Sequence, residues 1–374
     1  MKIFFPIGAF YPSQIGGPCN TLYWHTCALK SRGIEVNVVT TSLGLDDEKI
    51  VFDTPVNRDC GRVFYGSTPT VSLAVIKQII KGIHTSDVIH LNSLFNILSI
   101  FSFFYAGIFF PKKKLIWSVR GELSPEALTF SQRKKKPLLF LYKRWTKNVL
   151  FHSTSEKETN EIKSFLPQAV VVEIPNFIAP AVRRKEGVED VFLYLGRIHR
   201  IKALHKMIQG FALSQKFRDS NFKLFIAGKH EERHFDYYNE ISQLIISLGL
   251  EDKVEMKGHI TGEEKEKMYA RSYAFILPSE TENFGNVVLE ALNQGTPVVA
   301  SKGTPWSMLE LHNCGYHISN DPNDIALAVD KMIGLPEEDY HKMRADAVLL
   351  VDKKFNVTTQ IDKWIKIYNH EYTP

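Results

Sequence analysis

Two carboxylates flank the expected start of a helix in the C-terminal half of the chain. A strand ends at Leu277, a polar loop with Gly285 follows, and Asn286 is placed to cap the next helix. Glu282 lies before this cap and Glu290 lies one turn inside the helix. A helix start presents backbone amides to an anion, and carboxylates beside it suit sugar hydroxyls, which donate hydrogen bonds to them. The alternative is a capped surface helix with solvated glutamates, which leaves the polar loop unexplained.

Two cations follow another expected strand, residues 191–195. Arg197 leaves the end of that strand, and Lys202 lies near the start of the next helix. Ligands of parallel α/β sheets bind beyond the carboxyl ends of the strands, so both cations are placed to converge on a diphosphate in a cleft between domains. The alternative is a basic surface loop, and we expect His199 and Arg200 to be solvated.

A third candidate is the glycine pair Gly16 and Gly17, in the loop 10–18 after the first strand. Paired glycines before a helix let backbone amides approach a phosphate closely. The sequence is not a GxGxxG fingerprint, and a glycine pair in a loop is more often a simple turn.

The elements that must position these residues alternate along both halves of the chain. Short apolar runs separated by segments of helical length predict parallel βαβ units. We expect N-terminal strands at 2–5, 36–40, 88–91, 115–119 and 149–153, and C-terminal strands at 191–195, 222–227, 253–257, 274–277 and 297–300. A helix is expected over 20–32. The fold class is therefore α/β, with two doubly wound domains in series.

The domain boundary is expected within residues 170–190, where the strand VVVEIP gives way to a segment rich in proline and charge. We divide the chain into an N-terminal Rossmann-like domain at 1–176, a C-terminal Rossmann-like domain at 177–355 and a final helix at 356–374. That helix carries Ile361, Trp364, Ile365 and Tyr368, a stripe at helical spacing that must be buried against something.

The charge balance gives little indication of nucleic acid binding, because 46 Lys and Arg stand against 41 Asp and Glu. Basic residues nevertheless cluster at 112–114 and 133–136, and continue through Lys143, Arg144 and Lys147. Such clusters attract anionic surfaces, although a solvated face is the commoner explanation of either cluster alone. We expect no nucleic acid partner.

Residues 94–110 (LFNILSIFSFFYAGIFF) are nearly all apolar but are fewer than the roughly 20 residues of a spanning helix. We expect a buried or interfacial helix there. The N-terminus has the pattern of an opening strand and no signal peptide, and the four cysteines lack zinc-site spacing. These features predict a cytoplasmic protein with reduced thiols.

The motifs together resemble one enzyme family. PSETENFGNVVLEALNQGTPVV, GRIHRIKAL, the loop with Gly16 and Gly17, EIPNF at 173–177 and VEMKGHI at 254–260 occur in the order found in retaining glycosyltransferases of the GT-B fold, family 4 (glycosyl transferases group 1). The run from Glu282 to Glu290 matches the E-x7-E element of that family. The resemblance covers nearly the whole chain and is most specific in the C-terminal half.

The resemblance implies two Rossmann-like domains facing across a cleft, with the last helix crossing back to the first domain. It implies that Arg197 and Lys202 hold the donor diphosphate, and that Glu282 binds the transferred sugar and Glu290 the ribose. The remaining donor contacts are assigned to Gly16, Gly17, His259, Ile260, Phe284, Gly285, Asn286, Val287 and Val288.

The sequence departs from many relatives at one position. A histidine is common after the strand 115–119, whereas this chain has Arg120 followed by Gly121, as in one branch of the family. A histidine-dependent role is therefore not transferred. Arg120 is expected to meet the diphosphate, the donor sugar or the acceptor, with Glu122 as a candidate polar partner. For His90 the sequence is equally consistent with a side chain that faces the same cleft and with a structural role.

These features predict a retaining hexosyltransferase that uses a UDP- or GDP-sugar and needs neither a cofactor nor a metal. The acceptor is expected to be a saccharide, with a lipid-linked saccharide favoured, in bacterial surface polysaccharide assembly (O-antigen, capsule or exopolysaccharide). We expect a peripheral position on the inner face of an anionic cytoplasmic membrane. A sugar-nucleotide epimerase and a non-catalytic sugar-nucleotide-binding module are the alternatives. The short chain and the absence of a PLP-type lysine context argue against a phosphorylase.

Overall fold

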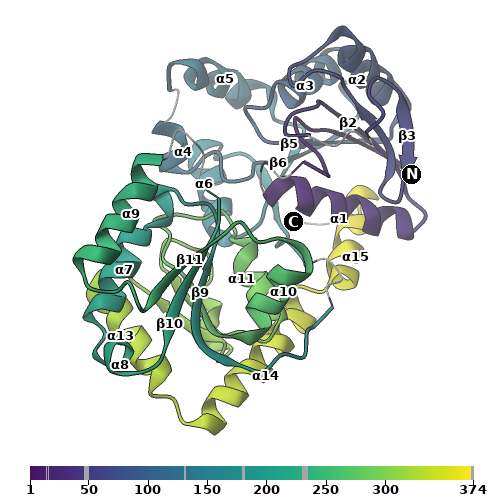
Figure 1. Cartoon of the computed structure of the whole chain (residues 1–374). Coiled ribbons are helices and arrows are strands. Elements are labelled where there is room, and N and C mark those ends of the chain that lie inside the picture. Colours follow the sequence, from purple (N-terminus) through teal and green to yellow (C-terminus); the bar gives the residue numbers. More distant parts are fainter. Residues whose placement is uncertain are drawn as a thin grey trace. The chain divides into compact units, whose positions relative to one another are not determined.

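The computed structural model describes residues 1–13, 15, 17–45, 50–129, 132–178, 182–229 and 235–371 (Figure 1). The chain divides into two compact units. Unit 1 comprises Met1–Ala179 and Val357–Pro374, and unit 2 comprises Pro180–Asn356. Each unit is an α/β layered structure around its own sheet, which confirms the expected fold class.

Unit 1 is built on an eight-stranded sheet with the order β3-β4-β2-β1-β5-β6-β7-β8. Its strands are β1 Lys2–Pro6, β2 Glu35–Thr40, β3 Pro55–Arg58, β4 Gly61–Tyr65, β5 Val88–Asn92, β6 Lys114–Ser118, β7 Val149–Ser153 and β8 Val170–Glu173. All neighbours pair in parallel except β3 and β4, which form an antiparallel hairpin at one edge. The direction of winding reverses between β1 and β5.

The helices of unit 1 are α1 Gly17–Ser31, α2 Leu73–Thr85, α3 Ile97–Phe109, α4 Pro125–Thr129, α5 Gln132–Trp145, α6 Glu156–Phe165 and α15 Val357–Tyr368. Alternate residues of β1 face two different cores, as the period of a strand requires. Ile3 and Phe5 join the core that holds α1 and α15, and Phe4 joins the core that holds α2 and α3.

The last helix, α15, belongs to unit 1. Ile361, Trp364 and Tyr368 are buried in the same core as α1, and Ile365 packs at the margin of that core. Arg32 after α1 also forms an ion pair with Asp362 at 2.5 Å. The helical stripe predicted from sequence therefore faces the N-terminal sheet, so the final segment returns to the first unit as expected.

The apolar segment 94–110 contains α3, which Asn96 caps through its side chain. Leu98, Phe103 and Ala106 are buried, whereas Ile108 and Phe109 are exposed. This helix has one packed face and one outward face. Within the described residues, no helix combines the length and hydropathy needed to cross a membrane.

Unit 2 contains a six-stranded, wholly parallel sheet with the order β11-β10-β9-β12-β13-β14. Its strands are β9 Glu189–Leu195, β10 Lys223–Ala227, β11 Val254–Gly258, β12 Ser272–Leu277, β13 Val298–Ser301 and β14 Gly315–Ile318. In order of appearance this is the 3-2-1-4-5-6 arrangement of a dinucleotide-binding domain, with a switch point between β9 and β12.

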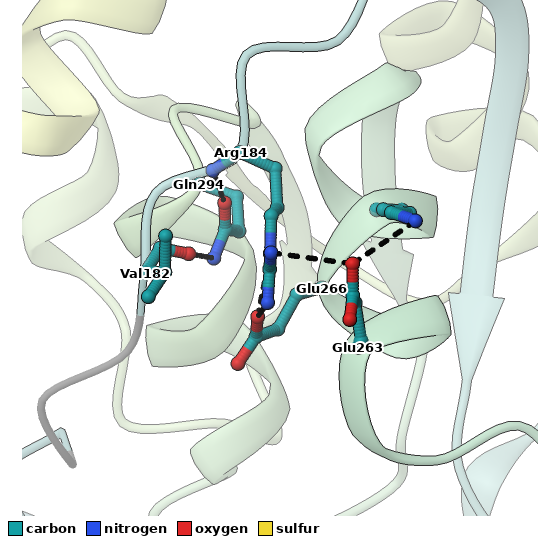
Figure 2. A network of polar contacts seen from close by, with 6 residues as sticks. Val182, Arg184, Glu263, Glu266 and Gln294 are labelled. Atoms are coloured by element: carbon teal, nitrogen blue, oxygen red, sulfur yellow. Dashed lines mark hydrogen bonds and ion pairs between the residues drawn. The ribbon is translucent and has the colours of Figure 1, made fainter.

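The helices of unit 2 are the 3-10 turn η1 Arg200–Lys202, α7 Leu204–Leu213, α8 Gln215–Asp219, α9 Phe235–Ser247, α10 Gly262–Arg271, α11 Asn286–Asn293, α12 Met308–Leu311, α13 Pro322–Ile333 and α14 Glu337–Lys354. A polar network secures the far end of α11 (Figure 2). Gln294 accepts from the Arg184 amide at 2.9 Å and donates to the Val182 carbonyl at 3.0 Å. The Arg184 guanidinium bonds Glu266 of α10 at 2.7 Å and Glu263 at 3.3 Å. The entry segment of unit 2 is thereby attached to α10 and α11.

Candidate active site

The switch point of the unit 2 sheet brings two of the predicted loops together. β9 and β12 are adjacent parallel strands, so the loops after Leu195 and Leu277 leave the same edge of the sheet. The Glu280 amide donates to the Ile201 carbonyl at 2.8 Å, which joins the two loops directly. Ligands of doubly wound sheets bind at such a point. The loop with Lys202 and the loop with Glu282 are therefore parts of one site.

Lys202 and Glu282 form an ion pair in this site. The two side chains are only 15% and 13% exposed, and Ser279 Oγ donates to Glu282 Oε1 at 2.8 Å. Lys202 lies at the end of η1, which His199 caps by accepting from the Ile201 amide at 3.0 Å. An ammonium has three N–H donors, so Lys202 can keep Glu282 and bind a phosphate oxygen at the same time.

Arg197 is exposed at the carboxyl end of β9. Its backbone carbonyl accepts from the buried Tyr194 hydroxyl at 2.9 Å, which fixes the backbone where the strand ends. Burial, reinforced by the nearby Glu282 carboxylate, raises the pKa of Tyr194. Arg200 lies away from this arrangement because its guanidinium bonds Glu240 of α9. The Arg200 side chain is 63% exposed, so this residue is solvated as expected, with a surface ion pair in addition.

The loop before α11 is tightly packed. Trp306 Nε1 donates to the Phe284 carbonyl at 2.5 Å, and the two rings lie 5.2 Å apart. The Glu282 amide donates to the Gly303 carbonyl at 3.1 Å. A Cβ on Gly303 would overlap the carbonyl oxygen of Glu280, so only glycine allows this close approach. Phe284 is thus a buried support of the loop that carries Glu282.

The expected cap of α11 is wrong by one residue. Gly285, with φ of 78°, occupies the N-cap position in the left-handed region, and Asn286 is the first helical residue. Glycine reaches this conformation without the steric cost that a Cβ carries. The Val288 amide donates to the Gly285 carbonyl at 2.9 Å. An anion would therefore compete with this carbonyl for the Val288 N–H. Asn286 and Val287 stand at the helix start, as their assigned role toward an anion requires.

Glu290 lies one turn into α11 and contacts α10. Its carboxylate pairs with Lys265 at 3.0 Å and accepts from the Tyr269 hydroxyl at 3.2 Å. Burial, with a further contribution from Glu290, raises the pKa of that hydroxyl. His259 is exposed and Ile260 is half-buried in the loop that follows β11, at the same edge of the parallel sheet. Lys265 and Tyr269 thus fix the orientation of the Glu290 carboxylate.

Arg120 follows β6 in unit 1 in a left-handed backbone conformation, with φ of 61°. Its guanidinium donates to Asn92 Oδ1 at 3.0 Å and to Asn176 Oδ1 at 3.3 Å. Burial lowers the pKa of Arg120, and the Glu158 carboxylate partly offsets that shift. Glu158 itself accepts from the Gly121 amide at 2.6 Å. Arg120 is therefore a half-buried cation whose direct bonds are to neutral amide oxygens.

Glu122 is a structural anchor of the neighbouring loop. It accepts from Ser93 Oγ at 2.6 Å, the Leu94 amide at 2.5 Å and the Phe95 amide at 3.1 Å. Burial raises the pKa of Glu122, and these hydrogen bonds oppose the shift. Among the described residues, the Glu122 carboxylate forms no hydrogen bond with Arg120, so it is not the polar partner that was expected. It fixes the turn before α3 instead.

The predictions for the two glycines and for His90 have different outcomes. Gly16 lies outside the described residues, and Gly17 is the exposed first residue of α1. His90 lies within β5 and is fully buried, so the structural alternative holds and the cleft-facing one is wrong. Its ring bonds the Tyr368 hydroxyl at 2.7 Å and Ser118 Oγ at 2.8 Å. Gly17 is placed as a helix-start donor.

His90 is the centre of a buried series of hydrogen bonds that could not be recognised from the sequence. His25 Nε2 lies 3.2 Å from the Tyr368 hydroxyl, and Ser118 Oγ lies 2.8 Å from His152 Nδ1. His152 Nε2 lies 2.9 Å from the Ile174 carbonyl, which can only accept. With neutral rings, this acceptor sets the donor and the acceptor of every other hydrogen bond in the series. Each imidazole then carries its proton on Nε2. The members come from three strands, β5, β6 and β7, and two helices, α1 and α15, which are far apart in the sequence.

Comparison with known proteins agrees with this geometry. The protein shares the fold of the Anabaena protein HepE in complex with UDP and glucose, with a TM-score of 0.76 and 20% identity over 99% of this chain and 100% of that one. That likeness concerns the fold, which is the GT-B fold of glycosyltransferase structures. Residues 178–348 match the family described as glycosyl transferases group 1. Unit 2 therefore carries a glycosyl transferases group 1 domain.

Curated relatives match in shorter segments. Mannosylfructose-phosphate synthase of Agrobacterium fabrum is 32% identical over 123 residues, which are 32% of this chain and 27% of that protein. The O-antigen chain mannosyltransferase RfbU of Salmonella typhimurium is 29% identical over 118 residues, 32% of this chain and 31% of that protein. The chain thus spans roughly three tenths of these two relatives.

Proposed function

We propose that the protein is a retaining glycosyltransferase that moves a sugar from a UDP- or GDP-sugar to a saccharide acceptor. The observation that carries the proposal is the largely shielded Lys202–Glu282 pair, 15% and 13% exposed, at the switch point of a dinucleotide-type sheet beside the start of α11. A cation and a carboxylate side by side suit a phosphate and a sugar hydroxyl that are covalently joined. The family match over 178–348 supports the same assignment.

The proposed chemistry breaks the bond between the sugar C1 and the diphosphate oxygen and forms a bond between C1 and an acceptor hydroxyl oxygen. The electron pair of the broken bond stays on the diphosphate, and the acceptor proton leaves with it or to solvent. Charge therefore develops on the departing phosphate, where preorganised donors have the largest effect. In this proposal Arg197, Lys202 and the amides of Asn286 and Val287 supply that stabilisation, so no metal or cofactor is required.

The other site residues take supporting parts in the proposal. Glu282 accepts from hydroxyls of the transferred sugar, and Glu290 accepts from the ribose. His259 and Ile260 meet the base edge, and Gly17 and Arg120 contribute from unit 1 to the diphosphate, the sugar or the acceptor. Retention of configuration follows from the family resemblance.

For the acceptor we propose a lipid-linked saccharide of a bacterial surface polysaccharide, presented at the inner face of the cytoplasmic membrane. The name of the Salmonella relative, an O-antigen chain mannosyltransferase, supports this class. A soluble sugar phosphate is the competing acceptor, as the name of the Agrobacterium relative illustrates.

A thermal-shift screen of UDP-, GDP- and ADP-sugars identifies the donor, because a ligand that binds only the folded chain raises the melting temperature. The decisive variant is Lys202→Met, with Lys206→Met as the matched control. Lys206 forms a similar ion pair, with Glu280 at 2.7 Å, from the neighbouring helix α7. We expect Lys202→Met to lower transfer and donor hydrolysis by roughly 10²- to 10³-fold, and Lys206→Met to leave both nearly unchanged. Equal activity of the two variants refutes the assignment.

Product analysis separates the alternatives. An epimerase converts the donor without an acceptor and releases a changed sugar, whereas a binding module shifts the melting temperature without turnover. A glycosyltransferase consumes donor in proportion to the glycosylated acceptor formed.

A further inference from the structure

One face of unit 1 exposes large apolar side chains that its own core does not cover. Ile97, Ile108 and Phe109 of α3 are 59%, 58% and 62% exposed, and Leu73 at the start of α2 is 77% exposed. The two helices are neighbours (Figure 1). Residues of both helices line a groove of about 550 Å³. Its lining consists of Val, Ile, Leu and Phe residues and Tyr105. Exposed apolar patches of this kind mark interaction sites.

The apolar groove continues onto α5. Phe104 lines the groove and packs edge-on against Trp145 at 5.5 Å. Trp145 in turn lines a second hollow with Phe140, and both side chains are exposed, at 46% and 73%. The remaining residues of that hollow are Lys143, Arg144 and Lys147. We call the surface formed by α2, α3 and α5 the α2–α3–α5 face. It passes from a purely apolar groove to an aromatic and basic rim.

The segment that contains α2, α3 and α5 is strongly basic. Residues 60–155 contain 14 Lys and Arg but only three acidic residues, Asp87, Glu122 and Glu126. Glu122 is committed to the loop before α3, and the Asp87 carboxylate accepts from the Lys2 amide at 2.7 Å. In the described part of 60–155, no Lys or Arg forms an ion pair with a carboxylate. Unit 2 differs, because Arg184, Lys202 and Lys206 there all pair with glutamates.

We propose that the α2–α3–α5 face docks on the surface of an anionic lipid bilayer. Exposed aromatic and aliphatic side chains enter the boundary between headgroups and acyl chains, and the lysines and arginines beside them attract anionic headgroups. The groove between α2 and α3 then receives an acyl chain. A second copy of the chain is disfavoured as the occupant, because two faces of the same positive charge repel each other. The inference rests on the proposed function for its purpose, since it brings unit 1 to a lipid-linked acceptor.

The test is co-sedimentation of the full chain with vesicles of phosphatidylcholine alone and of phosphatidylcholine mixed with phosphatidylglycerol, at low and high salt. We expect binding to the anionic vesicles that weakens at high salt. Replacing the three exposed cations of the second hollow, Lys143→Gln, Arg144→Gln and Lys147→Gln, lowers the partition coefficient by roughly fivefold per cation at low salt. The pair Ile108→Ser and Phe109→Ser lowers it by about tenfold or more at either salt concentration.

Matched controls come from unit 2, where the exposed residues Leu311 and Leu327 are 82% and 67% accessible. Leu311→Ser with Leu327→Ser, and Lys185→Gln with Lys342→Gln and Lys353→Gln, should leave vesicle binding unchanged. Stabilisation by a nucleotide-sugar should persist in every variant, which shows that the chain remains folded. If no nucleotide-sugar stabilised the wild-type chain although it bound vesicles, the result would contradict the proposed function and would still support the docking proposal.

Three results overturn the docking proposal. The first is failure of the wild-type chain to bind anionic vesicles. The second is unchanged binding in both the basic and the apolar variants, and the third is a concentration-dependent dimer in sedimentation velocity that the Ile108→Ser, Phe109→Ser variant abolishes without any vesicle binding in the wild type.

Discussion

Acidification should destabilise unit 1 through three buried histidines. Burial lowers the pKa of His25 and His90 well below the ordinary value, and it lowers the pKa of His152 to about 3. Arg120 and the neighbouring imidazoles add to these shifts. The buried series of hydrogen bonds explains the same preference, because it is satisfied when each ring is neutral and protonated at Nε2. An added proton leaves one N–H facing another donor.

The sign and size follow from proton linkage. Since the folded pKa values lie below the unfolded value of about 6.5, the unfolded chain binds more protons as the pH falls, and stability present above pH 6.5 is progressively lost. Between pH 7.5 and 5.5 each imidazole accounts for about 1.4 kcal/mol, or about 4 kcal/mol for three. That loss is a large part of the ordinary stability of a domain, about 5–15 kcal/mol.

The measurement is urea unfolding at several pH values, followed by tryptophan fluorescence. Four of the five tryptophans, Trp24, Trp117, Trp145 and Trp364, belong to unit 1, so the signal reports mainly that unit. His152→Gln should reduce the pH dependence by about a third, whereas the exposed control His341→Gln in α14 should not change it. The reasoning would be refuted if the free energy of unfolding did not change between pH 7.5 and 5.5. It would also be refuted if the slope corresponded to one extra proton or fewer bound on unfolding.

Three further substitutions test the packing that supports the site, each by thermal unfolding. Gly303→Ala should cost about 2 kcal/mol, or roughly 4–8 °C in melting temperature, because its Cβ overlaps the Glu280 carbonyl oxygen; a shift below a degree would contradict the close approach. Glu158→Ala should cost about 3 kcal/mol, because backbone amides of two loops lose a buried acceptor; retention of full stability would mean that water replaces it. Trp306→Phe should cost about 1–2 kcal/mol through the lost bond to the Phe284 carbonyl and should also weaken donor binding, so an effect on neither would separate this tryptophan from the site.

The strands that carry the site were predictable from the sequence because each is a short buried run bounded by turn residues. β7 matches the expected 149–153, and β9 begins two residues earlier than expected. The hairpin of β3 and β4 was missed because β3 has only four residues, PVNR, whose proline and arginine suggest a turn. An antiparallel edge hairpin also lies outside the βαβ rhythm on which the prediction relied.

The site was predictable where local chemistry defines it and unpredictable where contacts are distant. Residue types and strand ends were enough to propose Lys202 and Glu282 as members of one site. Their direct pairing joins residues 80 positions apart and depends on the strand order β9-β12, which the pattern alone did not supply. The same holds for His90, whose partner Tyr368 is 278 residues away.

The return of α15 to unit 1 constrains how the protein is made. The ribosome must synthesise all of unit 2 before the segment that contains Trp364 and Tyr368 emerges, a delay of roughly 10–35 s at about 5–20 residues per second. During that interval the nascent N-terminal sheet lacks the helix that covers His25 and its neighbours, and a ribosome that stops early leaves this surface open permanently. Prematurely terminated chains should therefore be favoured clients of chaperones and proteases through their N-terminal half, although the missing residues are at the opposite end.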